Sequence, residues 1–578
     1  MNLKQQRTRE YQILFCIGSL IGILCFLCVY GVKILDFSYT EWLMNGDMDL
    51  RQHFLGWCHF RSSDWHLPIG LIDSLSDPIR VSVIWTDSIP LFAVLFKLFR
   101  SVLPEMFQYF GLFGLLCYML QGGISILLVR RFTASKTVCI LSVPFFTLSF
   151  TMLQRMYYHT ALGAQWLLLL ALLLWFYDEW LDTLYKRCAV WFGMGFLCVS
   201  IHSYFVPMVG LIMIGSLIDT WMGQRTKQMD TRRSLQTFFM QVLMPASIYC
   251  IAAILNLFLL GAFYQDASPV GEGIGAFCSN LNTFINSLGH SSMLGALPVY
   301  GEFQYEGFAY LGAGILLLLV RLLVLMVKSL VTRQIKIDKA FFARHRRICL
   351  LGLIALVFVT LAVFPTITIG GIRLLGIPYF GPIKTIMNIF RSNGRFIWTP
   401  MYLLMLGAII LMIREQRYFP ITGRREWKRS SRENGNSAAI LLLAVAVLLQ
   451  IADISGWVRE KRAYFAEETH IYESVWDDVK EELAGKAHFV FMYDENDWIM
   501  DTAHYAYQHD MTQNNYYYAR DYSKQINEEI DKIYQELNQG LIREDTVYIF
   551  REQDLEYVSC EKLILIPIDD HVFGIARM

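Results

Sequence analysis

The chain has 578 residues, of which 55% are hydrophobic and 17% are charged, whereas a soluble protein carries about 25% charged residues. Its 50 Lys and Arg residues balance 50 Asp and Glu residues, so the net charge is zero. This composition is typical of a membrane protein, and it excludes a strongly basic protein that binds nucleic acid.

The first predicted element is an apolar run at residues 11–35, which follows a basic N-terminal segment. The run is longer than the core of a signal peptide, and no small-residue cleavage site follows it. We therefore predict an uncleaved first span with a cytoplasmic N-terminus. Ten further runs are long and apolar enough to cross a bilayer: 106–129, 137–153, 160–177, 188–202, 204–221, 238–262, 308–327, 348–365, 397–413 and 438–455.

The segment 88–103 is too short to be a span and carries Lys97 and Arg100. It predicts an amphipathic helix that lies on the outer membrane surface. The 12 cysteines follow no zinc-binding spacing, and most lie within apolar segments, as small core residues do.

The loops between spans differ in charge. Basic clusters occupy the predicted inner loops at 186–188, 225–233, 344–347 and 424–432, whereas the predicted outer loop 263–305 contains no Lys or Arg. Because basic loops stay in the cytoplasm, this asymmetry predicts an odd number of spans and an outer C-terminal tail.

The chain therefore divides into a transmembrane domain, residues 1–455, and an extracytoplasmic α/β domain, residues 456–578. In the second domain the pattern predicts short buried strands and one amphipathic helix: strands at 488–493, 546–550 and 563–568, and a helix at 523–539. The tyrosine run NNYYYARDY, residues 514–522, could stack on a sugar or be ordinary strand and surface.

Acidic and basic side chains gather at the predicted outer ends of the spans. Carboxylates there can accept a proton from a hydroxyl, and arginines or a lysine can hold a lipid phosphate. Arg391 and Arg395 are spaced so that one helix face would carry both. The candidate catalytic residues are Asp49, Asp47 and Glu306, and the candidate substrate-binding residues are His53, His159, His202, Tyr204, Lys384, Arg391 and Arg395.

Each of these residues also has an ordinary structural reading. Asp47 could cap a helix, Asp49 could pair with Arg51, and Glu306 could be an acid at a helix N-terminus. The arginines could anchor the chain at the interface. His53 could orient Asp49 or bind a metal ion, but no dense set of ligands is evident in the sequence, which assigns no metal site and leaves a divalent metal cofactor open.

At these positions the sequence resembles GT-C-type membrane glycosyltransferases, in particular a family of bacterial polytopic membrane proteins assigned to that fold. The resemblance covers all eleven spans in order. It rests on six short motifs: DLRQHFLGW (49–57), FRSSDWHLPIG (60–70), WTDSIPLFAVLFK (85–97), IHSYF (201–205), QYEGFAYLG (304–312) and FRSNGRF (390–396).

The resemblance implies a multi-pass enzyme of the bacterial cell membrane, with Asp49 as the acid of the first outer loop. It implies transfer of a sugar from a polyprenyl-linked donor to an envelope glycan or protein acceptor on the outer face. Two alternatives stay open, namely a transporter or flippase for a lipid-linked saccharide and a non-catalytic component of envelope assembly. A transporter usually binds near the middle of the bilayer, whereas the acids here lie in outer loops.

Overall fold

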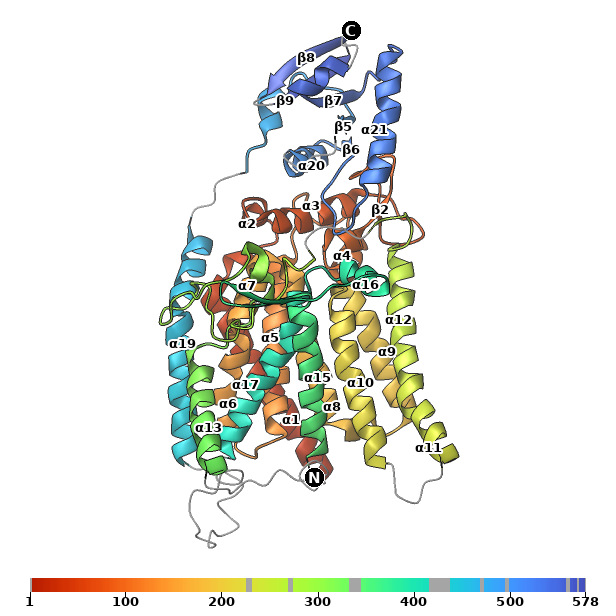
Figure 1. Ribbon diagram of the computed structural model, residues 1–578. Coiled ribbons are helices and arrows are strands. Elements are labelled where there is room, and N and C mark those ends of the chain that lie inside the picture. The colour runs from red at the N-terminus through yellow and green to blue at the C-terminus, as the bar shows by residue number, and fades with distance from the viewer. Residues whose placement is uncertain are drawn as a thin grey trace.

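A computed structural model shows a helical bundle, a layer of short helices across one of its ends, and a small domain above that layer (Figure 1). The structure describes residues 3–224, 231–268, 274–331, 345–414, 437–467, 472–493, 498–557, 562–568 and 571–576. Of the predicted basic inner loops, residues 225–230, residue 344 and the whole of 424–432 lie outside the described residues.

Eight helices of the described chain are long and apolar enough to cross a membrane, which makes this a multi-pass membrane protein. They are α1 (Leu3–Tyr30), α5 (Phe110–Arg130), α9 (Leu184–Ile201), α10 (Phe205–Gln224), α12 (Met244–Leu260, continuous with α11, Thr231–Phe238), α15 (Arg346–Val363), α17 (Trp398–Ile413) and α19 (Ser437–Ala466).

Three of the eleven predicted spans fall outside this set of eight. The predicted span 137–153 is a pair, α6 (Lys136–Thr147) and α7 (Phe150–Tyr158), bent by 42° and counted as a ninth span if taken as one. The predicted span 160–177 consists of the 3₁₀ helix Thr160–Gly163 followed by α8 (Trp166–Phe176), and it is shorter than the eight spans. The predicted span 308–327 begins later, as the 19-residue α13 (Ala313–Val331), which packs against α19.

Helices α1 and α5 show why the bundle packs closely. A Cβ atom at Gly18 would collide with the backbone carbonyl of Gly122, and one at Gly122 would collide with that of Gly18. The two backbones therefore touch. Within a bilayer such contact between small residues replaces the hydrophobic effect as the source of helix association.

Short helices cover the end of the bundle that faces the small domain (Figure 1): α2 (Glu41–Met44), α3 (Met48–Ser62), α4 (Pro90–Lys97) and α16 (Pro382–Ile389). The predicted surface helix 88–103 is thus helical only over α4. Lys97 points inward, because its ammonium group lies 4.0 Å from the Phe60 ring centre and donates to the Asp64 carbonyl at 3.2 Å.

The small domain contains a five-stranded mixed sheet in the order β6-β5-β7-β9-β8. Strands β5 (His488–Phe491), β6 (Thr512–Gln513) and β7 (Thr546–Arg551) are parallel, and β9 (His571–Ala576) and β8 (Leu563–Ile568) are antiparallel to their neighbours. Helices α20 (Ile499–Gln508) and α21 (Ser523–Asn538) complete it.

One prediction about this domain needs correction. The strand 563–568 is β8 at the sheet edge, and it is largely exposed because only β9 covers one side of it. Helix α19 continues without a break past the predicted boundary at 455 to Ala466 and extends toward the small domain. The N-terminus and this domain lie at opposite ends of the bundle (Figure 1), as an odd number of crossings requires.

Candidate functional site

The first turn of α3 holds two of the predicted acids in different roles. Asp47 is the N-cap, and its carboxylate accepts a hydrogen bond from the Met48 amide at 2.8 Å. Asp49 lies within the first turn, where the helix dipole favours an acidic side chain. The Asp47 carboxylate therefore caps the helix, whereas the Asp49 carboxylate does not.

Asp49 is half-buried, and the described residues provide no hydrogen-bond or ion-pair partner for its carboxylate. Burial raises the pKa of Asp49 to about 7, and the negative charge of Glu306 adds to this rise. The positive charge of Arg395 opposes it. Asp49 therefore titrates near neutral pH, in the electrostatic reach of both members of a buried ion pair.

That ion pair joins Glu306 and Arg395. The Arg395 guanidinium donates from Nε at 2.7 Å and from Nη2 at 3.2 Å to the two Glu306 oxygens. Arg155 adds a second contact to Glu306 at 3.0 Å, and all three side chains are buried. The two arginines hold the pKa of Glu306 well below its ordinary value, so Glu306 stays charged and is poorly suited to take up a proton.

The arginine pair does not form one helix face. Helix α16 ends at Ile389, and Arg395 belongs to the 3₁₀ helix Asn393–Ile397. Arg391 lies between them, with its guanidinium 5.6 Å from the Phe277 ring centre. The predicted shared face is therefore wrong, because the chain leaves the helical path at the residues that separate the two arginines.

Tyr204 contacts both Arg395 and one of the histidines. Its ring lies under the Arg395 guanidinium at 4.6 Å, and its hydroxyl accepts a hydrogen bond from the Ser392 amide at 2.9 Å. The Tyr204 amide in turn donates to Nδ1 of His202 at 3.2 Å. The ring of His202 lies 5.0 Å from that of His159.

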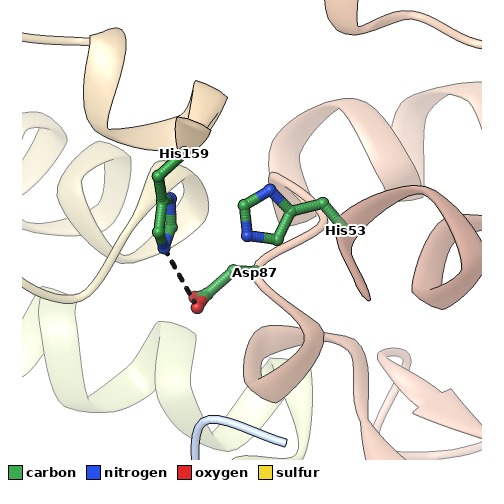
Figure 2. A group of neighbouring side chains, drawn as sticks. All are labelled: His53, Asp87 and His159. Carbon is green, nitrogen blue, oxygen red and sulfur yellow. Dashed lines mark ion pairs between the residues drawn. The ribbon is translucent and has the colours of Figure 1, made fainter. Parts of the chain in front are cut away.

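His53, Asp87 and His159 form a compact cluster, in which ligand atoms from all three residues lie within 4.8 Å of one another (Figure 2). The ring centres of His53 and His159 are 4.4 Å apart. His159 and His202 both approach the Asp87 carboxylate with Nε2, each at 3.5 Å. Burial lowers the pKa of the three histidines well below the ordinary value, so the imidazoles are neutral.

Asp87 is the central residue that sequence reasoning missed. It follows the 3₁₀ helix Val83–Thr86 and has left-handed backbone angles, φ 51° and ψ 24°, which Asp and Asn adopt more readily than most residues. The motif WTDSIP contains it, but its neighbours His53 and His159 come from other segments of the chain. The sequence around Asp87 therefore gives no sign of this cluster.

The tyrosine segment, residues 514–522, covers the site from the small domain. Gln52 of α3 donates to the Tyr517 carbonyl at 2.9 Å, and the Tyr516 hydroxyl donates to the Gln52 carbonyl at 2.9 Å. The Tyr517 hydroxyl lies beside the Arg391 guanidinium. Burial is the main cause of the raised pKa of Tyr517, and the negative charge of Asp49 raises it further. Arg520 lies 4.6 Å from the Trp85 ring centre.

The structure thus places the ten predicted residues at the end of the bundle beneath the small domain. Nine of them take part in the contacts and charge interactions described above, whereas Lys384 is exposed on α16. Asp87, Arg155, Tyr517 and Arg520 join the gathered set from other segments.

Comparison with known families adds one result for each part of the chain. A family model described as a domain of unknown function, DUF6311, matches residues 19–455, and a model described as the DUF6311 C-terminal domain matches residues 475–576. No curated protein matches the chain. The first matched region contains the bundle and its covering helices, and the second contains the sheet and the tyrosine segment.

Proposed function

The chain belongs to the DUF6311 family, and from the site described above we propose that it is a membrane glycosyltransferase of the GT-C type. The reaction moves a sugar from a polyprenyl-phosphate-type donor to an acceptor of the cell envelope. It takes place at the end of the bundle that carries the small domain. We propose that this end faces outward in a bacterial cell membrane, with the N-terminus in the cytoplasm.

The observation that carries this proposal is the Asp49 carboxylate, which has no partner among the described residues and has a pKa of about 7. A general base works best when its pKa is close to the working pH. In the proposed step the acceptor hydroxyl oxygen attacks the sugar carbon, and Asp49 takes the hydroxyl proton. The bond from that carbon to the lipid phosphate breaks, and the phosphate leaves with the electron pair.

The leaving phosphate needs positive charge, and the site offers it on the side of the tyrosine segment. The fork of Arg395 is occupied by Glu306, so we assign the phosphate to Arg391, with Arg520 beside it. Each of these two guanidinium groups lies against an aromatic ring, and neither forms an ion pair with a carboxylate of the described residues. An arginine free of carboxylates can form two parallel hydrogen bonds with a phosphate.

The test is a single-turnover assay with purified full-length protein, a radiolabelled hexose linked to polyprenyl phosphate, and an envelope fraction from cells that lack the gene. Asp49→Asn should slow transfer by about 10²–10⁴-fold, the usual contribution of a general base. Asp47→Asn is the matched control, because Asn is also a good N-cap, and it should keep most of the activity.

The same donor separates the alternative functions. A flippase would move the labelled lipid across proteoliposomes without releasing sugar, and a non-catalytic component would do neither. Labelled lipid that crosses the bilayer intact at equal rates in wild-type protein and Asp49→Asn would refute the transferase proposal.

A further inference from the structure

The cluster of His53, Asp87 and His159 (Figure 2) is built from three separate segments. His53 comes from the middle of α3, Asp87 from the turn before α4, and His159 from the residue that ends α7. Nothing in the proposed transfer step requires this cluster. Its chemistry can therefore be considered on its own.

The contact between His159 and Asp87 is too long for an ordinary hydrogen bond. Nε2 of His159 lies 3.5 Å from one Asp87 oxygen, whereas a good hydrogen bond between such atoms measures about 2.7–3.2 Å. Two ligands that each lie about 2.0–2.1 Å from a tetrahedral zinc ion are separated by about 3.3–3.5 Å. The observed spacing matches two ligands of one ion.

The buried nitrogens of the cluster lack partners. His53 is fully buried, and the described residues leave both its Nδ1 and its Nε2 without a hydrogen bond. The Nδ1 atom of His159 is also buried and unbonded. Leaving buried polar atoms unsatisfied is costly, and a bound cation would accept the lone pair of one nitrogen of His53.

His202 has a different role, because its Nδ1 accepts a hydrogen bond from the Tyr204 amide. The ring proton then lies on Nε2, which faces the second Asp87 oxygen at 3.5 Å and makes no hydrogen bond among the described residues. A small shift of Asp87 toward a bound ion would let this N–H orient the carboxylate, as the outer partners in metal sites commonly do.

We propose that His53, His159 and Asp87 bind one divalent transition-metal ion, with His202 as the positioning residue for Asp87. Two imidazoles and one carboxylate suit Zn²⁺ and its neighbours, whereas Mg²⁺ and Ca²⁺ prefer sites made of oxygen ligands. Three protein ligands leave a fourth position open, which is the pattern of zinc sites that bind a further ligand. This inference does not depend on the transferase proposal, because its readout is metal binding.

The experiment uses purified full-length protein that is stripped with a chelator and then titrated with Zn²⁺, with metal content measured after desalting. Co²⁺ serves as a second probe, because its visible absorption reports a four-coordinate site. We expect about one Zn²⁺ per chain and a rise in the unfolding temperature on Zn²⁺ addition. We also expect visible Co²⁺ bands that Zn²⁺ displaces.

The variants distinguish ligands from neighbours. Asp87→Asn removes the charge but keeps the left-handed turn, which Asn tolerates. Asp87→Asn and His53→Ala should each lower Zn²⁺ affinity by more than about 100-fold. His202→Gln should weaken binding by about 10–100-fold, as loss of an outer partner does. The control is His290→Gln, because His290 stacks on Trp457 away from the cluster, with ring centres 3.9 Å apart.

Wild-type protein that retains no stoichiometric Zn²⁺ or Co²⁺ would overturn the proposal. So would variants at His53 and Asp87 that bind Zn²⁺ as tightly as His290→Gln does. If a ligand variant fails to fold, the Co²⁺ spectrum and the thermal shift of wild-type protein still decide. Zinc binding without sugar transfer would leave this inference standing and remove the transferase proposal alone.

Discussion

Asp47 and Asp49 show how two identical side chains, two residues apart at the start of α3, acquire different chemistry. The Asp47 carboxylate is bonded to the backbone of α3, whereas Asp49 lies within electrostatic range of Glu306 and Arg395. The motif GDMDLRQH predicts a helix with an acidic N-terminus. Which of the two acids can exchange a proton depends on the residues that pack around them.

If Asp49 is the base, the rate of sugar transfer should depend on its titration. Because the pKa of Asp49 is raised to about 7, the active carboxylate is lost as the pH falls. The rate should drop about tenfold per unit below pH 7 and level off above it. Asp47→Asn should move this limb to lower pH, because the Asp47 charge helps to raise the pKa of Asp49.

A pH–rate profile of single-turnover transfer, measured for wild-type protein and Asp47→Asn, provides the check. A profile that is flat between pH 5 and 8 while transfer proceeds would exclude Asp49 as the base.

Glu306 should matter for stability more than for proton transfer. Its replacement in Glu306→Gln leaves the buried Arg155 and Arg395 without their carboxylate. Breaking one side of a buried ion pair costs about 3–5 kcal/mol, so the unfolding transition in detergent should move to clearly lower temperature. The matched control is Glu302→Gln in the same 3₁₀ helix (Glu302–Gly307), where the side chain is exposed.

The pH dependence of this contribution has a definite sign. Arg155 and Arg395 lower the pKa of Glu306 below its ordinary value of 4.5. The stabilisation is therefore present at neutral pH and is lost as the pH falls below that ordinary value and through the lowered pKa. Equal unfolding temperatures of Glu306→Gln and Glu302→Gln at neutral pH would show that the ion pairs of Glu306 with the two arginines do not stabilise the protein.

At the level of single elements, the apolar pattern predicted most helices and strands because it reports burial directly. The runs at 106–129 and 204–221 correspond to α5 and α10, and the helix predicted at 523–539 is α21. The predicted shared helix face of Arg391 and Arg395 is wrong, because four-residue spacing places two side chains on one face only in a continuous helix. Gly394, between them, lies in a 3₁₀ turn.

The site itself was predictable only in part. Polar residues at the ends of apolar runs pointed to Asp49, Glu306 and the histidines, because such positions share one side of a membrane. The sequence carried no spacing that would join His53, Asp87 and His159, which meet only through the packing of three elements. The covering role of the tyrosine segment was equally hidden, since a contact across hundreds of residues leaves no local pattern.

The tyrosine segment should control how tightly the small domain covers α3. The Tyr516 hydroxyl donates to the Gln52 carbonyl, and the Tyr518 hydroxyl bonds to that of Ser76 at 2.7 Å. The double variant Tyr516→Phe, Tyr518→Phe loses two buried hydrogen bonds worth about 0.5–1.5 kcal/mol each. Amide hydrogen exchange in α3 should become at least about 5-fold faster.

Tyr534→Phe is the control for this change, because the Tyr534 hydroxyl donates to the Met492 carbonyl within the small domain itself. It should leave exchange in α3 as in wild-type protein. Unchanged exchange in the double variant would mean that other contacts hold the domain in place.

For the molecule as a whole, the decisive property is which end of the bundle faces outward. The small domain and the N-terminus lie at opposite ends (Figure 1), and the basic loops predict that the N-terminus lies inside. Alkaline phosphatase fused to the C-terminus should therefore be active in a bacterial host. The same enzyme fused after residue 414, at the end of α17 and before the last crossing, should be inactive.

A fluorescent reporter that folds only in the cytoplasm should give the reverse result at both positions. Phosphatase activity at residue 414 together with none at the C-terminus would invert the proposed orientation and move the site to the cytoplasmic side.

The hydrogen bond between the Gln52 side chain and the Tyr517 carbonyl joins residues that are 465 positions apart. This separation determines when the site can form during synthesis. A ribosome releases α3 early and the tyrosine segment near the end of translation. Until then Asp49 has no cover, and no nascent or prematurely terminated product carries the finished site. The site is therefore complete only after the last domain has been synthesised and has packed against α3.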